Sequence, residues 1–484
     1  MYVGVDIGTQ SLKAVVTDAR FQVLGEAGAD YEPRYPRPGW AEQDPSLWEE
    51  ALAPTVGRAL AAANAKPGAV AALGVCGQLD GCIPVDAEGR ALGPCIIWSD
   101  RRAAEEISAL SAERVRALTG VVLDATHMAA KIRWLKRHHP EVRRIVRFHQ
   151  PVSYLVARLT GEHVFDHGLA STTMLYSLQR GAFEPELLSA FEIEARELPC
   201  IRDAADRAGR LHAHGAGLTG LPAGLPVAVG TGDDYSNPLG AGVVAPGPVA
   251  CTLGTAEVVG ALHGSPSIDA GGLLETHRYA GGAFFIENPG WLSGGAVAWL
   301  LAILDLRSPG ELDRLAEGTP AGADGVLFLP ALSGAMAPEW IGSARGCFYG
   351  LAAGHHRGHL ARALLEGCAY AMRDVVSRLR EMEVATETIL LLGGGARSRT
   401  WGQIRADLTG LPVEVAAAPD TSPLGAALLA SLAAGGHADL RSAAGELGRA
   451  RAVLEPDPRN RGPYEAAYQR YRRLFDSLRP MYGS

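Results

Sequence analysis

The chain carries two copies of a short pattern in which an apolar segment, a Gly-Thr pair and a second apolar segment follow one another. The copies span residues 3–16 and 249–259, and their Gly-Thr pairs begin at Gly8 and Gly254, 246 positions apart in a chain of 484 residues. A tight turn made of glycine and hydroxyl residues can aim backbone N–H groups and a side-chain hydroxyl at an anion. Two such turns that face each other would hold a polyphosphate from both sides.

Length and charge narrow the class of protein. A chain of 484 residues is too long for one ordinary hydrophobic core, so we expect two large domains. The net charge of −8 argues against a nucleic acid or an acidic membrane surface as a partner, because both require clustered Lys and Arg.

The cysteines and the N-terminal segment indicate the compartment. The seven cysteines are an odd number, widely spaced and without a C-x-x-C pair, which favours buried free thiols over a zinc site. No apolar run approaches about 18 residues, and no basic leader precedes the first strand. We therefore predict a cytoplasmic protein that does not span a membrane.

Both halves of the chain begin with strands and continue with alternating strands and helices. In the first half, three strands precede a helix at 46–63, with Ser46 as its N-cap. The second half begins with a hairpin at 248–262 and continues through a helix, a strand and a helix at 399–409, 412–416 and 423–434. We predict an α/β architecture repeated twice, with a boundary near residue 243. Combined with the two turns, this is the plan of a two-domain phosphotransferase that uses ATP.

Several motifs, in one order along residues 1 to 435, resemble those of the FGGY carbohydrate kinases, and among these the xylulokinases. The motifs are Asp6-Ile7-Gly8-Thr9, Gly39-Trp40-Ala41-Glu42-Gln43-Asp44-Pro45, Gly77-Gln78, Gly232-Asp233, Leu253-Gly254-Thr255, Ala344-Arg345-Gly346 and Gly393-Gly394-Gly395-Ala396. The resemblance implies two actin-like (RNase H-like) domains with a catalytic cleft between them: a sugar-binding domain over 1–243 and a nucleotide-binding domain over 244–484. It also implies ATP and Mg²⁺ as cofactors.

Asp233 is the predicted general base. A sugar hydroxyl is a weak nucleophile, and a carboxylate within hydrogen-bond reach can accept its proton as the phosphoryl group moves. The resemblance places the catalytic aspartate of the family directly after Gly232. The alternative is that Asp233 caps a helix over 234–240. Its neighbour Asp234 either supports that helix or contacts a substrate hydroxyl.

The first Gly-Thr turn supplies candidate ligands for phosphate and metal. Asp6 ends the first strand and, together with Asp233, would face the phosphates with Mg²⁺ between them, through water. The alternative for Asp6 is a turn residue that bonds its own backbone. The predicted phosphate ligands of the two turns are Thr9, Gln10, Ser11, Lys13, Gly254 and Thr255. Lys13 is equally compatible with a solvated strand position.

A glycine-rich loop follows the strand at 388–392 and precedes a helix. Such a loop presents backbone N–H groups at a helix N-terminus, ready for a phosphate or a nucleoside. By resemblance this loop lies under the adenosine, and its predicted ligands are Gly394, Gly395, Ala396 and Ser398. The alternative is a plain left-handed turn.

The predicted sugar pocket departs from the xylulokinase pattern. Leu79-Asp80 follows Gln78 where xylulokinases typically carry Met-His, and Trp98-Ser99-Asp100 stands where they often carry Trp-Asn-Asp. A neutral histidine donates or accepts toward a sugar hydroxyl, whereas an ionised aspartate only accepts. Asp80 therefore either selects a different hydroxyl pattern or pairs with Arg101 or Arg102 outside the pocket. The predicted substrate residues are Gln78, Leu79, Asp80, Trp98, Asp100, Asp233 and Asp234.

These patterns favour an ATP-dependent kinase that phosphorylates a hydroxyl of a ketopentose such as D-xylulose. The alternatives are a kinase for another ketose or an alditol, and a catalytically silent sugar-binding regulatory protein of the same fold. The predicted partners are a small sugar and ATP, with a second copy of the chain as a possible homodimer partner.

Overall fold

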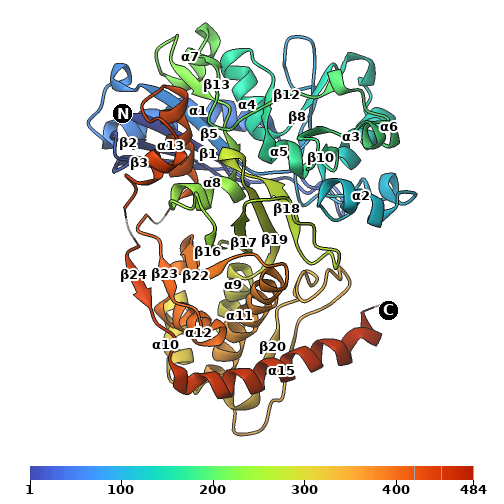
Figure 1. Cartoon of the computed structure of the whole chain (residues 1–484), viewed down its shortest axis with the longest axis vertical. Coiled ribbons are helices and arrows are strands. Elements are labelled where there is room, and N and C mark those ends of the chain that lie inside the picture. Colours follow the sequence, from blue (N-terminus) through green and yellow to red (C-terminus); the bar gives the residue numbers. More distant parts are fainter. Residues whose placement is uncertain (419, 449, 483–484) are drawn as a thin grey trace. The chain divides into compact units, whose positions relative to one another are not determined.

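The computed structural model describes residues 1–418, 420–448 and 450–482 (Figure 1). These residues form two compact units. Unit 1 contains residues 1–244, 276–285 and 420–448, and unit 2 contains the remaining described residues. The arrangement differs from a single division near residue 243, because two later segments of the chain fold with the N-terminal part.

Unit 1 is built around a seven-stranded sheet. Strands β1 (Tyr2–Ile7) and β2 (Ser11–Thr17) form the predicted antiparallel hairpin, which β3 (Val23–Asp30) continues. On the other side of β1, β5 (Ala72–Gly77) runs parallel to it. The strand order is β13-β14-β5-β1-β2-β3, and β15 also pairs with β5. The remaining bounds are β13 (Arg207–Arg210), β14 (Pro226–Ala228) and β15 (Thr231–Gly232).

Helices cover both faces of this sheet. Helix α1 (Pro45–Ala62) packs on β3 so closely that a Cβ at Gly25 would lie 2.4 Å from the Ala59 carbonyl oxygen. Helix α13 (Ser422–Ala433) packs on β1 at Gly4. Gly25 in β3 pairs with Val16 in β2, and Val16 pairs with Val3 in β1, so Gly25 and Val3 lie on the same face of the sheet. Gly4 follows Val3 and lies on the opposite face, because successive residues of a strand alternate between the two faces. The two helices therefore lie on opposite faces.

The start of α1 differs from the prediction. Asp44 is the N-cap, and its side chain accepts a 3.0 Å hydrogen bond from the backbone N–H of Ser46. Pro45 occupies the first helical position, where no N–H is needed and its fixed φ suits a helix. Ser46 therefore lies inside the first turn.

Shorter elements complete unit 1. Its other helices are α2 (Ala112–Thr119), α3 (Met128–His138), α4 (Pro151–Thr160), α5 (His167–Thr172), α6 (Pro185–Ala190), α7 (Ala213–Thr219), α8 (Asp233–Gly240) and α14 (Leu440–Ala444). Its two-stranded pairs are built from β4 (Glu42–Gln43), β6 (Ile83–Val85), β7 (Cys95–Ile96), β8 (Arg147–His149), β9 (Val164–Asp166), β10 (Tyr176–Ser177), β11 (Ala182–Phe183) and β12 (Cys200–Arg202).

Helix α13 comes from the second half of the chain but belongs to the sheet of unit 1 (Figure 1). A Cβ at Gly4 would lie 1.8 Å from the Pro423 carbonyl oxygen, and one at Gly74 would lie 1.9 Å from that of Ala426. Gly4 and Gly74 are register partners in β1 and β5, so they form one side-chain-free patch. The helix backbone rests directly on this patch. The predicted series at 399–434 therefore ends in a helix of the other unit.

Substitution of Gly74 by alanine should destabilise unit 1 by about 1–3 kcal/mol, because the added methyl group overlaps backbone atoms of α13 and forces the helix away. Gly57→Ala in α1 is the matched control, since nothing lies within 4 Å of that position. The control should be stabilising by about 0.5–1 kcal/mol. Urea denaturation of both variants tests this, and equal midpoints would show that α13 does not rest on β5.

Unit 2 contains a second sheet, in which strands follow the order β19-β17-β16-β22-β23-β24. Strands β16 (Gly247–Leu253) and β17 (Ala256–His263) form the second predicted hairpin. Strand β22 (Thr386–Leu392) runs parallel to β16, and β23 (Val413–Val415) runs parallel to β22. The other bounds are β19 (Phe284–Leu292), β20 (Leu327–Leu329), β21 (Cys347–Tyr349) and β24 (Ala452–Leu454), and β18 (Glu275–Arg278) falls mostly in the 276–285 segment of unit 1.

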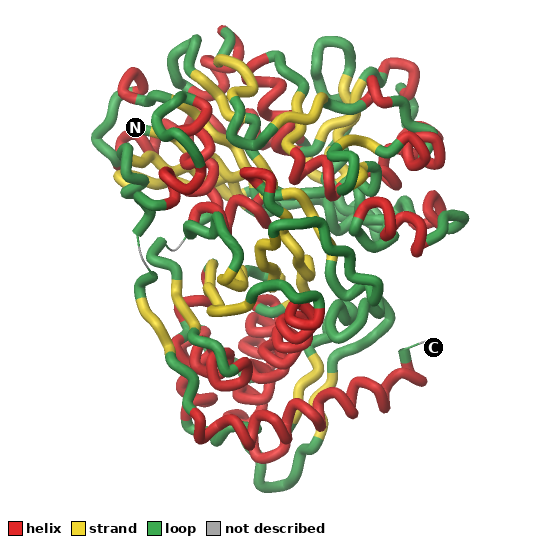
Figure 2. Tube along the Cα trace, in the orientation of Figure 1, coloured by secondary structure: helices red, strands yellow, loops and turns green. Residues whose placement is uncertain are grey.

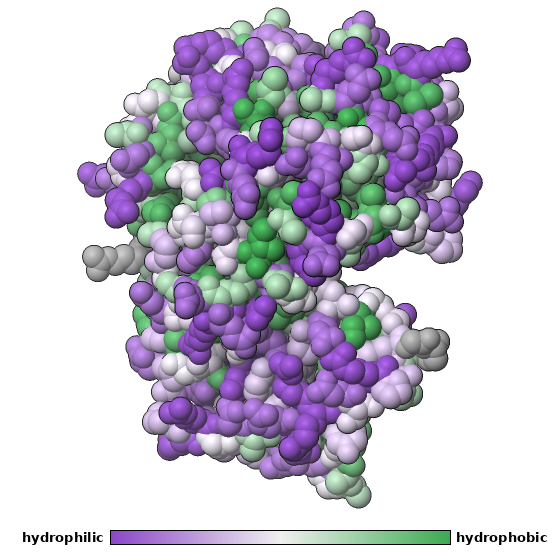
Figure 3. All heavy atoms as spheres, turned by 45° about the vertical axis from the view of Figure 1, so that its right-hand side comes forward, coloured by the Kyte–Doolittle hydropathy of each residue, from purple (hydrophilic) through white to green (hydrophobic). Residues whose placement is uncertain are grey.

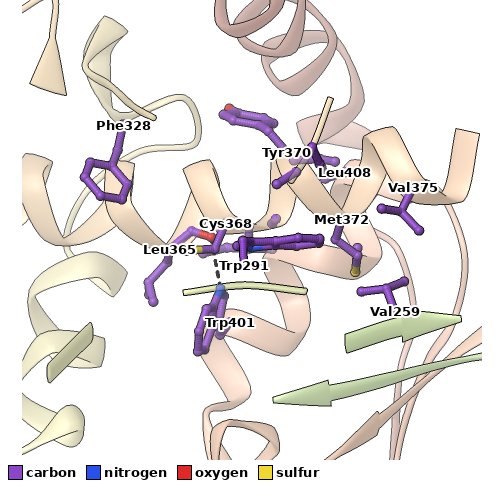
Figure 4. Packing of buried hydrophobic residues seen from close by; sticks show 14 of the residues in the cluster. Val259, Trp291, Phe328, Leu365, Cys368, Tyr370, Met372, Val375, Trp401 and Leu408 are labelled. Atoms are coloured by element: carbon purple, nitrogen blue, oxygen red, sulfur yellow. Dashed lines mark hydrogen bonds between the residues drawn. The ribbon is translucent and has the colours of Figure 1, made fainter. Parts of the chain in front are cut away.

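Helices lie beside the strands of unit 2 (Figure 2). They are α9 (Gly294–Ile303), α10 (Pro309–Glu317), α11 (Arg357–Glu381), α12 (Arg399–Thr409) and α15 (Arg461–Leu478). Their buried faces form one apolar core, part of which Figure 4 shows. Within it, Trp401 donates a 2.9 Å hydrogen bond from its indole N–H to the Leu365 carbonyl oxygen, so the one polar atom of that side chain is satisfied.

Hydrophilic side chains cover most of the face drawn in Figure 3, with smaller hydrophobic patches between them. Among the described residues, no helix combines the length and the apolar character that crossing a membrane would require.

Candidate active site

Three predicted site residues lie at one edge of the unit 1 sheet. In the register of the parallel strands, Asp6 and Thr231 both align with Cys76, and the strands β5 and β15 end one residue later. Gln78 and Asp233 directly follow those strand ends. Parallel strands lie about 4.8 Å apart, so β1 and β15, on either side of β5, are roughly 10 Å apart. This spacing brings Asp6 and Asp233 to the same edge with room for a small group between them.

Asp233 is the first residue of α8, and Gly232 occupies the N-cap position. Its carboxylate makes no capping bond to the later turns of the helix. It accepts a 3.2 Å hydrogen bond from the backbone N–H of the neighbouring Asp234. Helix capping therefore does not account for the Asp233 side chain. Its half-buried carboxylate lies at the edge of the sheet.

The carboxylates of this edge hold protons unusually tightly. Loss of hydration, followed by the charges of Asp233 and Asp420, raises the pKa of Asp6 to about 8. Loss of hydration, followed by the charge of Asp234, raises the pKa of Asp233 to about 7. Burial and then Asp80 raise the pKa of Asp234 to about 7. Several acids thus share one region that lacks a full set of compensating positive charges.

These shifts predict that the ligand-free protein loses stability as the pH rises. Between the unfolded pKa near 4 and the folded values of about 7 and 8, the folded state binds more protons than the unfolded state. The free energy of unfolding therefore decreases with pH in this window. Thermal melts without divalent cations should show a falling midpoint from about pH 6 to about pH 9.

The Asp6→Asn variant should show a flatter dependence, because one of the responsible groups is removed. Asp30→Asn, at an exposed position at the end of β3, is the control and should keep the wild-type slope. Equal slopes for Asp6→Asn and wild type would contradict the proposed origin of the effect.

Lys13 is bound by a carboxylate that the sequence did not single out. Its ammonium nitrogen lies 2.5 Å from Asp420 Oδ2, in the segment that leads into α13. The same carboxylate contributes to the raised pKa of Asp6. The predicted phosphate ligand Lys13 thus has a protein partner within unit 1. Only the tertiary structure brings these two residues, 407 positions apart, together.

The first Gly-Thr turn is linked to the predicted sugar loop through side chains. The Trp98 indole N–H donates to the Thr9 hydroxyl oxygen at 3.0 Å. Gln43 donates to the Thr9 carbonyl oxygen at 2.7 Å and accepts from the Gln78 amide at 2.7 Å. The turn itself is closed by a 3.0 Å hydrogen bond from the Gly8 N–H to the Ser11 carbonyl oxygen. Substrate and phosphate residues predicted separately therefore form one connected group.

The loop after β5 packs against the strand that carries Asp233. A Cβ at Gly232 would lie 2.0 Å from a methyl carbon of Leu79, which explains why glycine precedes Asp233. Asp80 lies 3.1 Å from the Nδ1 atom of His127. The predicted alternative pairing of Asp80 with Arg101 or Arg102 is wrong, because Arg101 binds Asp124 and Arg102 binds Asp100.

Asp100 has a structural role in this geometry. Its carboxylate is fully buried, accepts a 2.6 Å hydrogen bond from the Ala41 N–H and forms a two-pronged ion pair with Arg102. Both oxygens are occupied, so the carboxylate has no free site for the substrate contact that we predicted. The sequence predicted a substrate role for Asp100, and the structure contains a buried ion pair instead.

In unit 2, the second Gly-Thr turn abuts the start of α9. The Gly294 N–H donates to the Gly254 carbonyl oxygen at 3.2 Å, and the Gly295 N–H donates to that of Thr255 at 3.0 Å. A Cβ at Gly294 would lie 2.3 Å from the Gly254 oxygen, so only glycine allows this approach. The first N–H groups of α9 are therefore bonded to the carbonyl oxygens of the turn and hold it against the start of the helix.

The glycine-rich loop lies next to the same turn within unit 2. Gly393 adopts a positive φ of 78°, and a Cβ there would lie 2.9 Å from the Leu253 carbonyl oxygen. Residues Gly394–Arg397 form a short 3₁₀ helix before α12. Ser398 caps α12 by accepting from the Trp401 N–H, and its hydroxyl donates to Asp313. These two bonds favour a capping role for Ser398.

A pocket of about 590 Å³ opens beside this loop. Its lining includes small side chains from the loop and from the segment after β23, together with three arginines. They are Ala396, Ala416 and Ala417, and Arg397, Arg399 and Arg451. Apolar walls with a few charged groups suit a flat heterocycle that carries phosphates.

The residues of unit 1 fit a hydrated cation better than a directly bound one. In the part of the chain that the structure describes, no group of three or more His, Cys, Asp or Glu side chains is arranged to hold a metal ion. The buried Asp6 Oδ1 accepts no hydrogen bond from the described residues. A hydrated Mg²⁺ would supply the missing donors through its water ligands.

Known proteins are similar to this chain over almost its whole length. Residues 1–240 match the N-terminal domain of the FGGY family of carbohydrate kinases, and residues 249–434 match its C-terminal domain. The chain is 31% identical to a xylulose kinase of Escherichia coli (strain K12), over 99% of this chain and 100% of that protein. It is 36% identical to a glycerol kinase of Rhodospirillum centenum, over 90% of each.

Solved structures agree with this. The crystal structure of xylulose kinase from Rhodospirillum rubrum superposes with a TM-score of 0.91 at 31% identity, covering 100% of both chains. The predicted α/β fold of two actin-like domains is confirmed by this match.

Proposed function

Because the chain belongs to the FGGY family of carbohydrate kinases, we propose that it transfers the γ-phosphate of ATP to a hydroxyl group of a ketopentose, with Asp233 as general base. Its activity as an ATP-dependent carbohydrate kinase follows from the family. The observation that supports the residue assignment is the half-buried Asp233 carboxylate at the start of α8, with its pKa raised to about 7.

The raised pKa suits proton transfer at neutral pH. A base works best when its pKa lies near the working pH, since a large fraction is ionised and its proton affinity is still high. The substrate hydroxyl would donate its proton to Asp233 as its oxygen attacks the γ-phosphorus. Mg²⁺, held through water by Asp6 and Asp233, would supply neutralisation of the phosphate charge.

The proposed nucleotide ligands lie on both units. Thr9, Gln10, Ser11 and Lys13 belong to the hairpin of unit 1, where Lys13 would exchange Asp420 for a phosphate. Gly254, Thr255, Gly394, Gly395 and Ala396 belong to unit 2, and the pocket beside the glycine-rich loop supports adenosine binding there. Ser398 would then support this loop as the cap of α12.

D-Xylulose is the first candidate substrate, because full-length relatives named xylulose kinase are similar to this chain. Relatives named glycerol kinase are similar at comparable identity, and they support an alditol as the second candidate. Cytoplasmic location and a homodimer remain predictions.

A coupled assay of ADP release, run against pentuloses, hexuloses and alditols, tests the proposal. We expect ATP consumption that depends on the added sugar and is highest for one structural class. If no sugar raises ATP consumption above the background while sugars still bind in calorimetry, the silent sugar-binding alternative is correct instead.

A further inference from the structure

His127 is a buried imidazole that contacts the carboxylate of the predicted sugar loop. It directly precedes α3, is 4% exposed, and its Nδ1 atom lies 3.1 Å from Asp80 Oδ2. A carboxylate only accepts, so the proton of this hydrogen bond sits on Nδ1. The contact fixes the tautomer of His127 and occupies one of the two oxygens of Asp80.

The backbone of Asp80 is held just as firmly. Its N–H donates to the Gln150 side-chain oxygen at 3.0 Å, and its carbonyl oxygen accepts from the Lys131 ammonium at 2.6 Å. Lys131 is fully buried and also donates to the Thr126 carbonyl oxygen, one residue before His127. Asp80 has a φ of 56°, a left-handed conformation that persists only when the surroundings enforce it.

The second oxygen of Asp80 remains available to a ligand. Asp80 Oδ1 is buried and has no hydrogen-bond partner among the described residues. Asp80 lies close enough to Asp234 to raise the pKa of that residue, and Leu79 packs on Gly232 beside the general base. A buried acceptor without a donor is destabilising, and a bound donor would recover that cost.

We propose that His127 is a specificity-determining residue that positions Asp80 so that Oδ1 accepts a hydrogen bond from a substrate hydroxyl. This inference rests on the proposed function. The charged groups near Asp80 are the carboxylate of Asp234 and the ammonium of Lys131, which is engaged by backbone oxygens. The site therefore accepts a neutral polyol segment at this point. It rejects a carbonyl oxygen, which cannot donate, and a carboxylate, which the carboxylates of Asp80 and Asp234 repel.

Substrate analogues test the selectivity. The best substrate of the ADP-release screen is compared with its analogues that lack one hydroxyl each and with the aldonic acid of the same length. We expect one deoxy analogue to lose at least about 10³-fold in kcat/KM, because a site built to bond a hydroxyl rejects its absence strongly. The aldonic acid should give no turnover. Turnover of the aldonic acid at a rate similar to that of the best substrate would overturn the proposal.

Variants test the role of His127. His127→Phe keeps a flat ring but removes the donor, and we expect KM to rise about 10–100-fold with kcat within about 3-fold. His127→Gln, which can still donate to Asp80, should recover at least part of this loss. His138→Phe, at the exposed last position of α3, should leave both constants unchanged. The affinity for ADP, measured by calorimetry, should be the same in all of them.

A double-mutant cycle separates positioning from general support. If His127 acts through Asp80, His127→Phe should change KM by less than about 2-fold in an Asp80→Asn background. Equal effects of His127→Phe in both backgrounds, or a parallel loss of ADP affinity, would overturn the proposal. Should His127→Phe fail to fold, the same cycle is run with His127→Leu, which also lacks the donor. Failure of the proposed function is a different result, namely no sugar-dependent ATP consumption by the wild-type enzyme.

Discussion

Replacement of Asp233 by alanine should lower kcat by about 10²–10⁴-fold while leaving the affinity for ADP nearly unchanged. General base catalysis contributes a factor of this size, and the pKa of Asp233, about 7, suits the task. The side chain makes no helix-capping bond beyond its neighbour, so its loss should leave α8 intact. Steady-state kinetics with the best sugar, combined with calorimetry of ADP binding, measure both quantities.

Asp234→Asn is the matched control, because Asp234 has a similar raised pKa and lies one residue further into α8. Its side chain is assigned to substrate contact, so we expect a change in KM that exceeds the change in kcat. A normal kcat for Asp233→Ala would remove Asp233 from its role. A larger kcat loss for Asp234→Asn would transfer the role of base to that residue.

Replacement of Glu257 by alanine should destabilise unit 2 by about 3–5 kcal/mol. Glu257 and Arg405 form a two-pronged ion pair at 2.5 and 2.8 Å, and both side chains are fully buried. Removal of one partner leaves an uncompensated charge in an apolar core, which is far more costly than the net value of the pair. Urea denaturation of wild type and variant measures the difference in the free energy of unfolding.

Two control variants test whether the loss of stability in Glu257→Ala comes from an unpaired buried charge. Joint replacement of both residues by methionine should be much less destabilising than Glu257→Ala, because no charge is then left buried. Glu339→Ala breaks an ion pair with Arg479 that is 51% and 41% exposed, and should change stability by less than about 1 kcal/mol. A loss below about 1 kcal/mol for Glu257→Ala would contradict the proposed burial of the pair.

The ion pair also connects stability to the proposed nucleotide site. Glu257 lies two residues after Thr255, and its carboxylate accepts a 2.7 Å hydrogen bond from the Ser293 hydroxyl. The Ser293 N–H in turn donates to the Thr255 carbonyl oxygen. The buried polar network of Arg405, Glu257 and Ser293 is therefore hydrogen-bonded to the second Gly-Thr turn and fixes the geometry of the turn before any ligand binds.

Local sequence patterns predicted the elements that depend on local interactions. The two hairpins at the Gly-Thr turns are present, and the predicted helix at 399–409 has these bounds in the structure. Apolar periodicity, strand propensity and turn glycines act within a few residues, so they can be read without knowledge of the fold. The sequence also singled out Asp233 and Asp6 as candidates, because Asp233 directly follows a strand and Asp6 is the next-to-last residue of one.

Local sequence patterns did not predict the contacts between segments that are distant along the chain. The sequence grouped the helix at 423–434 with the second half, although it packs on the glycine patch of β1 and β5. It left Asp100 as a candidate for substrate contact, although Arg102 and the Ala41 N–H occupy its carboxylate. No local sequence pattern distinguishes a glycine on which a helix packs closely from a glycine that forms a turn.

The sequence by itself determined the repeated α/β plan, the two Gly-Thr turns and the acid that follows the Gly-x-Gly segment. Only the tertiary structure decided which partner each charged side chain takes: Asp420 for Lys13, His127 for Asp80 and Arg405 for Glu257. The physical reason is that turns and strands form from neighbours along the chain. The partner of a buried charge is chosen by packing between segments that can be hundreds of residues apart.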